Sequence, residues 1–181
     1  QRAVVAMYNE YFGGSMNSIV FQEMREKRSL AYQASSRYIM GSNKTDKNYN
    51  LAHIATQNDK VVEAFDAFNS LLDYMPVAEN NFDLAKQSLL KSIATNRTTK
   101  QAIISSYLTD KEYGRKENTQ KKMYEQLQKM TFEDIKAFSE QNLKGQKRVY
   151  VILGSKDQIN FDEVKKFGDI EELSLEEIFG Y

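Results

Sequence analysis

The stretch that decides the fold reads YNEYFGGSMNSIVFQEMREKRSLAY and spans residues 8–32. Apolar residues recur at helical spacing up to Gly13 and Gly14, which predicts a helix that ends there because glycine tolerates positive φ. Ser15 can cap a second helix, which would leave Arg25 on a face away from the core. The predicted buried stripe of this second helix is Met16, Ile19, Val20 and Met24.

Downstream, alternation of side chains predicts two strands, over residues 30–40 and 49–56. The polar residues 41–47 between them predict a turn, so the strands most simply pair antiparallel. Helical spacing then returns. We expect one helix with the stripe Val61, Phe65, Phe68 and Leu72, another with Phe82, Ala85, Leu89 and Ile93, and shorter helices over residues 99–142.

The C-terminal part of the chain is less regular. Residues 148–154 form a compact apolar run with branched side chains, which predicts a buried central strand. Residues 161–167 predict a short helix, and residues 170–175 predict an edge strand. Because the helices arrive in consecutive blocks, we expect one α+β domain over residues 1–181. Its sheet would be mixed but rich in antiparallel pairs, with the helices packed on one face.

The overall composition restricts the partners. The 25 Lys and Arg residues balance the 25 Asp and Glu residues, so no basic field attracts phosphates and we expect no nucleic acid partner. No window approaches the roughly 18 consecutive apolar residues that span a membrane, so we expect no membrane partner. The absence of cysteine is compatible with a cytoplasmic or a periplasmic location. The first residues contain neither an initiator Met nor a signal peptide, so we expect a piece of a longer polypeptide.

The sequence lacks the residues of a catalytic metal site. It contains one histidine, His53, whereas catalytic zinc takes about three protein ligands, and no His-x-x-Glu-His motif is present. His53 is better explained as a hydrogen-bonded strand residue. There is also no cysteine and no Gly-x-Ser-x-Gly elbow for nucleophilic catalysis. We therefore expect this chain alone to be inactive and free of metal.

Arg25 and Tyr32 are the candidate catalytic residues. They lie seven residues apart across the predicted helix-to-strand corner, so both tips can converge on one point. A guanidinium and a phenol are both hydrogen-bond donors at neutral pH and can stabilise an oxyanion. Each also has an ordinary explanation, Arg25 as a surface partner of a nearby glutamate and Tyr32 as a half-buried strand aromatic.

The sequence around this pair resembles the C-terminal-type domain of the pitrilysin/insulinase-type zinc metallopeptidases, the inverzincins. Arg25, Glu26, Leu30 and Tyr32 stand in the places of that family's phrase Arg-Glu-x-x-Gly-Leu-x-Tyr, while Ser29 replaces its glycine. Further likeness is carried by Gly13, Gly14, Ser18, Phe21 and Gln22, and by the phrase Lys-x-Phe-Gly-x-x-x-Glu-Leu over residues 165–173.

This resemblance implies an α/β sandwich like those of LuxS and the mitochondrial processing peptidase, here without its first strand or strands. It implies that Arg25 and Tyr32 contact the carbonyl or oxyanion of a peptide substrate. Zinc would be bound through His-x-x-Glu-His by an N-terminal-type domain, in the same polypeptide or in a partner subunit.

Two other functions stay open. The chain could be a non-catalytic structural subunit of the same fold, although the retained Arg25 and Tyr32 argue against this. It could also be an interaction module whose open sheet edges bind an extended peptide. A His-x-x-Glu-His motif in the parent polypeptide or in a neighbouring reading frame would favour the peptidase.

Overall fold

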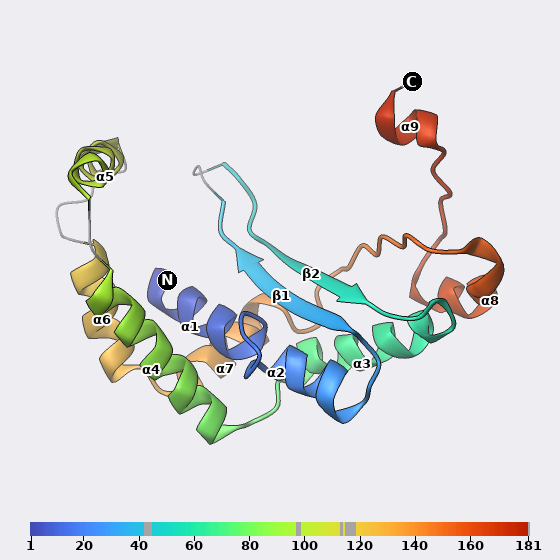
Figure 1. Ribbon diagram of the computed structural model, residues 1–181, viewed down its shortest axis with the longest axis horizontal. Helices are drawn as coiled ribbons and strands as arrows, with labels where there is room; N and C mark the ends of the chain where they lie inside the picture. The colour runs from blue at the N-terminus through green and yellow to red at the C-terminus, as the bar shows by residue number, and fades with distance from the viewer. Residues whose placement is uncertain (42–44, 97–98, 113, 115–118, 181) are drawn as a thin grey trace.

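The computed structural model of the protein describes residues 1–41, 45–96, 99–112, 114 and 119–180. In this part of the chain, helices pack beneath a two-stranded antiparallel sheet (Figure 1). The α+β class and the antiparallel pairing predicted from the sequence are confirmed.

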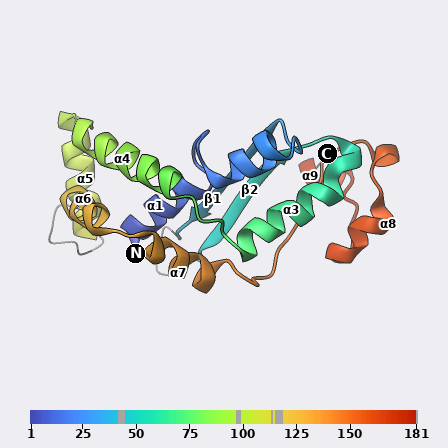
Figure 2. The same cartoon turned by 90° about the horizontal axis from the view of Figure 1, so that it is seen from below.

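The sheet consists of β1 (Gln33–Ile39) and β2 (Tyr49–Ala55). The long helices are α1 (Arg2–Phe12), α3 (Val61–Asp73), α4 (Glu79–Thr95), α5 (Lys100–Glu112), α6 (Thr119–Lys129) and α7 (Phe132–Asn142). The short ones are α2 (Ile19–Phe21), the π-helix η1 (Gln22–Lys27), α8 (Phe161–Val164), α9 (Leu175–Phe179) and the 3₁₀ turns η2 (Asn58–Lys60), η3 (Lys156–Gln158) and η4 (Lys165–Phe167). Helices α4 to α6 lie at one end of the molecule, and α3 and α8 lie at the other (Figure 2).

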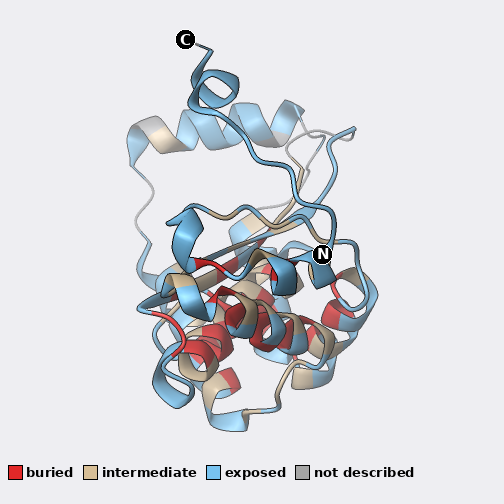
Figure 3. Cartoon of the chain, turned by 90° about the vertical axis from the view of Figure 1, so that its right-hand side faces the viewer, coloured by how far each residue is buried: buried red, intermediate tan, exposed pale blue. Residues whose placement is uncertain are grey.

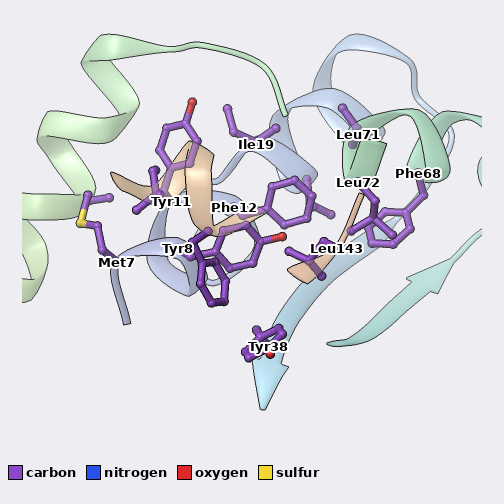
Figure 4. Packing of buried hydrophobic residues seen from close by; sticks show 14 of the residues in the cluster. Met7, Tyr8, Tyr11, Phe12, Ile19, Tyr38, Phe68, Leu71, Leu72 and Leu143 are labelled. Atoms are coloured by element: carbon purple, nitrogen blue, oxygen red, sulfur yellow. The ribbon is translucent and has the colours of Figure 1, made fainter. Parts of the chain in front are cut away.

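Helix α1 forms the centre of the main hydrophobic core. Its residues Tyr8 and Phe12 are fully buried, and their rings stack with centroids 5.0 Å apart (Figure 4). Phe138 of α7 packs against Tyr8 at 5.2 Å and against Tyr38 of β1 at 4.9 Å. Buried residues gather in this helical layer, whereas α5 and the C-terminal tail carry mostly exposed ones (Figure 3). The core therefore joins α1 to the sheet and to α7.

The glycine that ends α1 is needed for close packing. Gly13 has φ of −144°, so the positive φ expected at this helix end is wrong. A Cβ on Gly13 would lie 2.2 Å from the Ser36 carbonyl oxygen and 2.5 Å from its backbone nitrogen. The Ser36 N–H also donates to the Gly13 carbonyl at 3.3 Å. Only glycine lets the end of α1 approach β1 this closely.

The hairpin follows the alternation that the sequence predicts. The register pairs Gln33 with Ala55 at one end and Ile39 with Tyr49 at the other. Alternate residues of β1 face the helices and are buried, as expected for a sheet that is covered on one face. The predicted turn includes residues 42–44, which lie outside the described part of the chain. The buried residues of β1 are Ala34, Ser36 and Tyr38.

The predicted helices are confirmed with shifted ends, but the second one begins later than expected. Ser18, and not Ser15, caps α2, because the Ser18 hydroxyl accepts the Phe21 N–H at 3.5 Å. Met16 consequently lies before the helix and is exposed, so its place in the buried stripe is wrong. No helix in the described ranges has the length and the apolar character needed to cross a membrane.

Both strands predicted near the C-terminus are wrong. Residues 148–154 have no strand partner, and the alternate residues Val149, Val151 and Leu153 are 93%, 90% and 102% exposed. Residues 170–174 are also unpaired, and α9 begins directly after them. A strand is defined by its neighbour, and no described segment pairs with either stretch.

Candidate functional site

The corner that carries the candidate residues is built on a π-helix. Helix α2 widens into η1 after Phe21, and the wider winding ends where the Leu30 N–H donates to the Met24 carbonyl at 2.9 Å. Met24 is fully buried, which leaves the adjacent Arg25 on the outside. Short π-helical turns inside helices often mark functional sites.

Ser29 closes the corner in a conformation that favours glycine. Its φ of 50° lies in the left-handed region, and it is the one described non-glycine residue with positive φ. The Ser29 N–H donates to the Arg25 carbonyl at 3.0 Å, which holds the turn in place. Left-handed backbone costs an ordinary L-residue about 1–2 kcal/mol. This strain explains why the resembling family has glycine at this place.

The hairpin fixes the other side of the corner. The Tyr32 N–H donates to the Ala55 carbonyl at 2.8 Å, one residue before β1 begins. The Thr56 hydroxyl donates to the Leu30 carbonyl at 2.6 Å. These two bonds attach the backbone on both sides of Ala31 to the end of β2. The hydrogen bonds to the end of β2 therefore fix the backbone position of Tyr32.

The structure brings Arg25 and Tyr32 together. The guanidinium carbon of Arg25 lies 5.6 Å from the centre of the Tyr32 ring, and 4.9 Å from the ring of Phe21. Cation–π contacts of this length are attractive, so both rings help to position the guanidinium. The Arg25 Nε atom is also 3.6 Å from a carboxylate oxygen of Glu26. This contact is the pairing with a nearby glutamate that the ordinary explanation of Arg25 predicts, but its distance is long for an ion pair.

The site lies on the surface. The Tyr32 residue is 83% exposed and the Arg25 side chain is 42% exposed, so Tyr32 is not the half-buried aromatic of its ordinary explanation. An open hollow of about 460 Å³ lies nearby, and Arg28 is part of its lining, but Arg25 and Tyr32 are not. The hollow is lined mainly by α3 residues together with Glu163 and Lys166. Both candidate side chains are therefore accessible to a molecule that docks on this face.

No metal site among the described residues accompanies the pair. Among the described residues, no group of three or more His, Cys, Asp or Glu could hold a metal ion. His53 lies in β2 and is exposed, and no hydrogen bond joins its side chain to another described residue, contrary to the expected hydrogen-bonded histidine. The residues present in the described ranges thus do not fit a zinc ion.

Sequence reasoning missed several residues that shape the site. Phe21 lies four residues before Arg25, a helical spacing that would have indicated their contact. Thr56 has no comparable signal, because its contact depends on how the hairpin closes on the corner. The left-handed backbone of Ser29 could have been indicated by the glycine that the resembling family has at this place.

The chain is similar to known proteins over its N-terminal half and in its fold. A family model described as peptidase M16 inactive domain matches residues 1–89. A conserved protein from Enterococcus faecalis V583 has a similar structure, with a TM-score of 0.64 and 17% identity over 78% of this chain and 33% of its own. A peptidase M16 inactive domain from Pseudomonas fluorescens has a TM-score of 0.58 and 22% identity over 78% of this chain and 34% of its own. The chain thus spans about a third of each of these structures, and no curated protein sequence matches it.

Proposed function

We propose, from the match of residues 1–89 to the peptidase M16 inactive-domain model, that the chain is the substrate-binding half of a zinc-dependent endopeptidase. Its role is to bind a peptide and to place Arg25 and Tyr32 on the carbonyl that is cleaved. The zinc ion belongs to a second domain, in the same polypeptide or in a partner subunit. The observation that carries this proposal is the approach of the Arg25 guanidinium to within 5.6 Å of the Tyr32 ring.

This arrangement suits the stabilisation of negative charge. The guanidinium offers several N–H donors and the phenol offers one O–H donor, and neither has to gain or lose a proton to act. The Tyr32 backbone is held by β2 and the Arg25 backbone by the Ser29 N–H, so the donors sit on an ordered corner. Donors that are already in place cost little reorganisation when an oxyanion forms.

The loose contacts of Arg25 leave it available to a substrate. Its Glu26 contact is 3.6 Å long and largely solvent-exposed, and such pairs contribute little to stability. Docking of a second domain on this face would exclude water from the pair and so strengthen its interaction with a developing charge. The high exposure of Tyr32 in the single chain is consistent with a site that two domains complete.

The test uses the complete enzyme, in which this chain is combined with its zinc-binding domain. We expect Arg25→Ala and Tyr32→Phe each to lower kcat by about ten- to a thousandfold, because each removes one oxyanion donor. Arg28→Ala and Tyr49→Phe are matched controls, since both residues are exposed and neither contacts the pair. Unchanged turnover in both site variants, with folding intact, would rule out this role.

The alternative is a non-catalytic subunit of the same fold. The description of the matching family as an inactive domain is consistent with this alternative. The described part of the chain also contains no cluster of residues that could hold a metal ion. In that case Arg25 and Tyr32 variants would weaken association with the partner domain and leave kcat unchanged at saturating partner. Measuring kcat and association in parallel separates the two functions.

A further inference from the structure

The C-terminal tail, residues 169–180, stands apart from the packed helices and the sheet (Figure 1). Every residue in it is exposed, as Figure 3 also shows. One ion pair, between Lys156 and Glu172 at 2.5 Å, joins its side chains to the rest of the described chain. Such an exposed pair contributes little to stability, so the tail is available to a partner.

The tail nevertheless contains a well-defined helix, α9. The Ser174 hydroxyl accepts the Glu177 N–H at 3.2 Å, and the Glu177 carboxylate accepts the Ser174 N–H at 2.7 Å, which forms a capping box. Gly180 ends the helix with a φ of 75°. A helix this short is marginal in water unless one side packs against another surface. Its complete set of end signals therefore indicates a helix that is used in binding.

One side of α9 is apolar. Leu175, Ile178 and Phe179 follow the i, i+3, i+4 spacing that puts side chains on one side of a helix, and they are 73%, 55% and 59% exposed. Helices with this spacing bind by laying their apolar side into a groove of another surface. The tail thus has the form of a docking segment.

The charge of the tail restricts the surface that it fits. The tail contains five acidic residues and no lysine or arginine. Among them, Glu171 and Glu176 form no ion pair with a described residue. A surface that binds α9 must combine an apolar hollow with positive charge, because opposite charges favour association and like charges oppose it. The acidic residues are Asp169, Glu171, Glu172, Glu176 and Glu177.

The groove between α4 and α6 offers such an apolar hollow. It is open, has a volume of about 520 Å³, and is lined in part by Ile93 and Ala94 of α4 and by Tyr124 of α6. The Lys86 ammonium of α4 donates to the Met130 carbonyl, just after α6, at 2.9 Å. The end of α6 therefore lies beside the middle of α4, and the two helices run antiparallel.

Lysines surround this hollow. Lys121 lines it, and the antiparallel course of the helices places Lys91 and Lys129 together at one end of it. Neither Lys91 nor Lys129 forms an ion pair with a described residue. Residues 84–95 and 119–129 together contain five lysines and one acidic residue, Glu125. The hollow and the tail thus match in apolar character and are opposite in charge.

We propose that the tail of one copy of this chain docks into the α4–α6 hollow of a second copy. The apolar side of α9 lies on Ile93, Ala94 and Tyr124, and the carboxylates of the tail face the lysines. Within one copy, α9 and the hollow lie at opposite ends (Figure 2), so the tail pairs with another molecule. Two copies in antiparallel orientation exchange both tails, which closes the assembly as a two-fold dimer. This inference does not depend on the proposed peptidase function.

Sedimentation velocity of the full chain tests the association. We expect a monomer–dimer equilibrium that weakens as the salt concentration rises, because salt screens exposed charges. Reversing charges at the hollow, with Lys91→Glu and Lys129→Glu together, should weaken association at least about tenfold. Lys147→Glu is the control and should change nothing, since Lys147 is exposed, has no ion pair with a described residue and lies outside both surfaces.

A charge exchange between the two surfaces separates docking from damage to the fold. Glu171→Lys with Glu176→Lys in the tail should also weaken association at least about tenfold, and combining all four changes should restore most of it. A chain that stays monomeric up to about 100 μM would overturn the proposal. So would a dimer that the reversals leave unchanged, or reversals that the combined variant does not rescue.

Cross-linking tests which surfaces meet and whether they belong to different molecules. The chain contains no cysteine, so one introduced pair gives an unambiguous disulfide. Leu175→Cys in one copy should cross-link to Ala94→Cys in a second, differently tagged copy. It should not cross-link to Tyr49→Cys, at an exposed position of β2. A disulfide that forms only when both cysteines are in the same chain would refute the proposal, because the tail would then bind its own hollow.

Discussion

Two buried tyrosines of α1 differ in what their hydroxyl groups contact. The Tyr11 hydroxyl donates to the Pro76 carbonyl at 2.7 Å and accepts the Ala78 N–H at 3.0 Å. The Tyr8 hydroxyl is buried, and it is not hydrogen-bonded to a described residue. Burial raises the pKa of Tyr8 well above its usual value, and the nearby Ser139 side chain only partly opposes this effect.

This contrast predicts opposite effects of the same substitution. Tyr11→Phe should lower the free energy of unfolding by about 1–3 kcal/mol, because it leaves a carbonyl and an N–H without their partner. Tyr8→Phe should leave it unchanged or raise it by up to about 1 kcal/mol, because it removes an unpaired buried hydroxyl. Urea unfolding of the two variants and the wild type measures the difference. Equal losses in both variants would contradict the hydrogen-bond assignment.

Tyr11 also predicts a dependence on pH. Burial raises its pKa to about 12, although the Ala78 N–H acts in the opposite direction. The unfolded chain releases the phenolic proton near pH 10, before the folded chain does, so the stabilisation by Tyr11 is complete below about pH 10 and falls as pH rises toward 12. The difference in unfolding free energy between wild type and Tyr11→Phe should therefore shrink above about pH 10. A difference that stays constant or grows up to pH 11 would disprove the raised pKa.

At the residue scale, sequence reasoning was strongest where spacing along one helix or strand decides the outcome. The buried face of β1 follows from such spacing. The approach of Arg25 to Tyr32 was instead predicted from their separation of seven residues across the corner between the helix and the strand. The need for glycine at position 13 could not be predicted in this way, because the atoms that exclude a side chain there belong to the backbone of Ser36 in β1. The packing of one element against another decides such a requirement, and the local sequence pattern carries no information about that packing.

At the scale of elements, one side chain joins α1 to the edge of β1. The Asn9 side-chain amide donates to the Tyr38 carbonyl at 3.0 Å, and its oxygen accepts the Tyr38 N–H at 2.7 Å. Asn9 thus substitutes for a neighbouring strand at this position. Together with Gly13 it holds the sheet on the helical layer, and the sheet in turn holds Tyr32 through the Ala55 carbonyl.

We predict that Asn9→Ala lowers the free energy of unfolding by about 1–3 kcal/mol, because it leaves both backbone groups of Tyr38 without partners. Asn9→Asp should rescue only part of this loss, since a carboxylate can accept the N–H but cannot donate to the carbonyl. Asn80→Ala, at an exposed position in α4, is the control and should change stability by less than about 0.5 kcal/mol. Thermal unfolding of the three variants measures these effects. Full stability of Asn9→Ala would mean that the helix packing alone holds β1.

The same scale explains why one predicted strand is absent. The alternation in residues 148–153 correctly indicated that one face lies on the helices, as the contacts of Tyr150 with α3 show. The alternation could not indicate a neighbouring strand, because strand pairing depends on which other segments lie alongside. The prediction of a buried central strand was thus wrong, although the alternation correctly separated the side chains that face the helices from those that are exposed.

At the scale of the whole molecule, several stretches of the described chain expose large apolar side chains. Besides residues 148–153, one face of α5 is exposed, with a stripe at helical spacing. The tail around α9 is similarly apolar and exposed. These surfaces support the proposal that the chain works against a partner domain. The exposed apolar residues of α5 are Ile103, Ile104, Tyr107 and Leu108, and those of the tail include Leu173, Leu175, Ile178 and Phe179.

The proposed division of a peptidase's chemistry between two domains makes a prediction for this chain alone. The described residues contain no group able to hold a metal, and catalytic zinc takes about three protein ligands. The purified chain should therefore retain far less than one zinc per molecule after dialysis, measured by plasma mass spectrometry, and should not cleave fluorogenic peptides. Adding the zinc-binding domain should restore cleavage, and Arg25→Ala should reduce the restored rate. Stoichiometric zinc or cleavage by the chain alone would contradict this division.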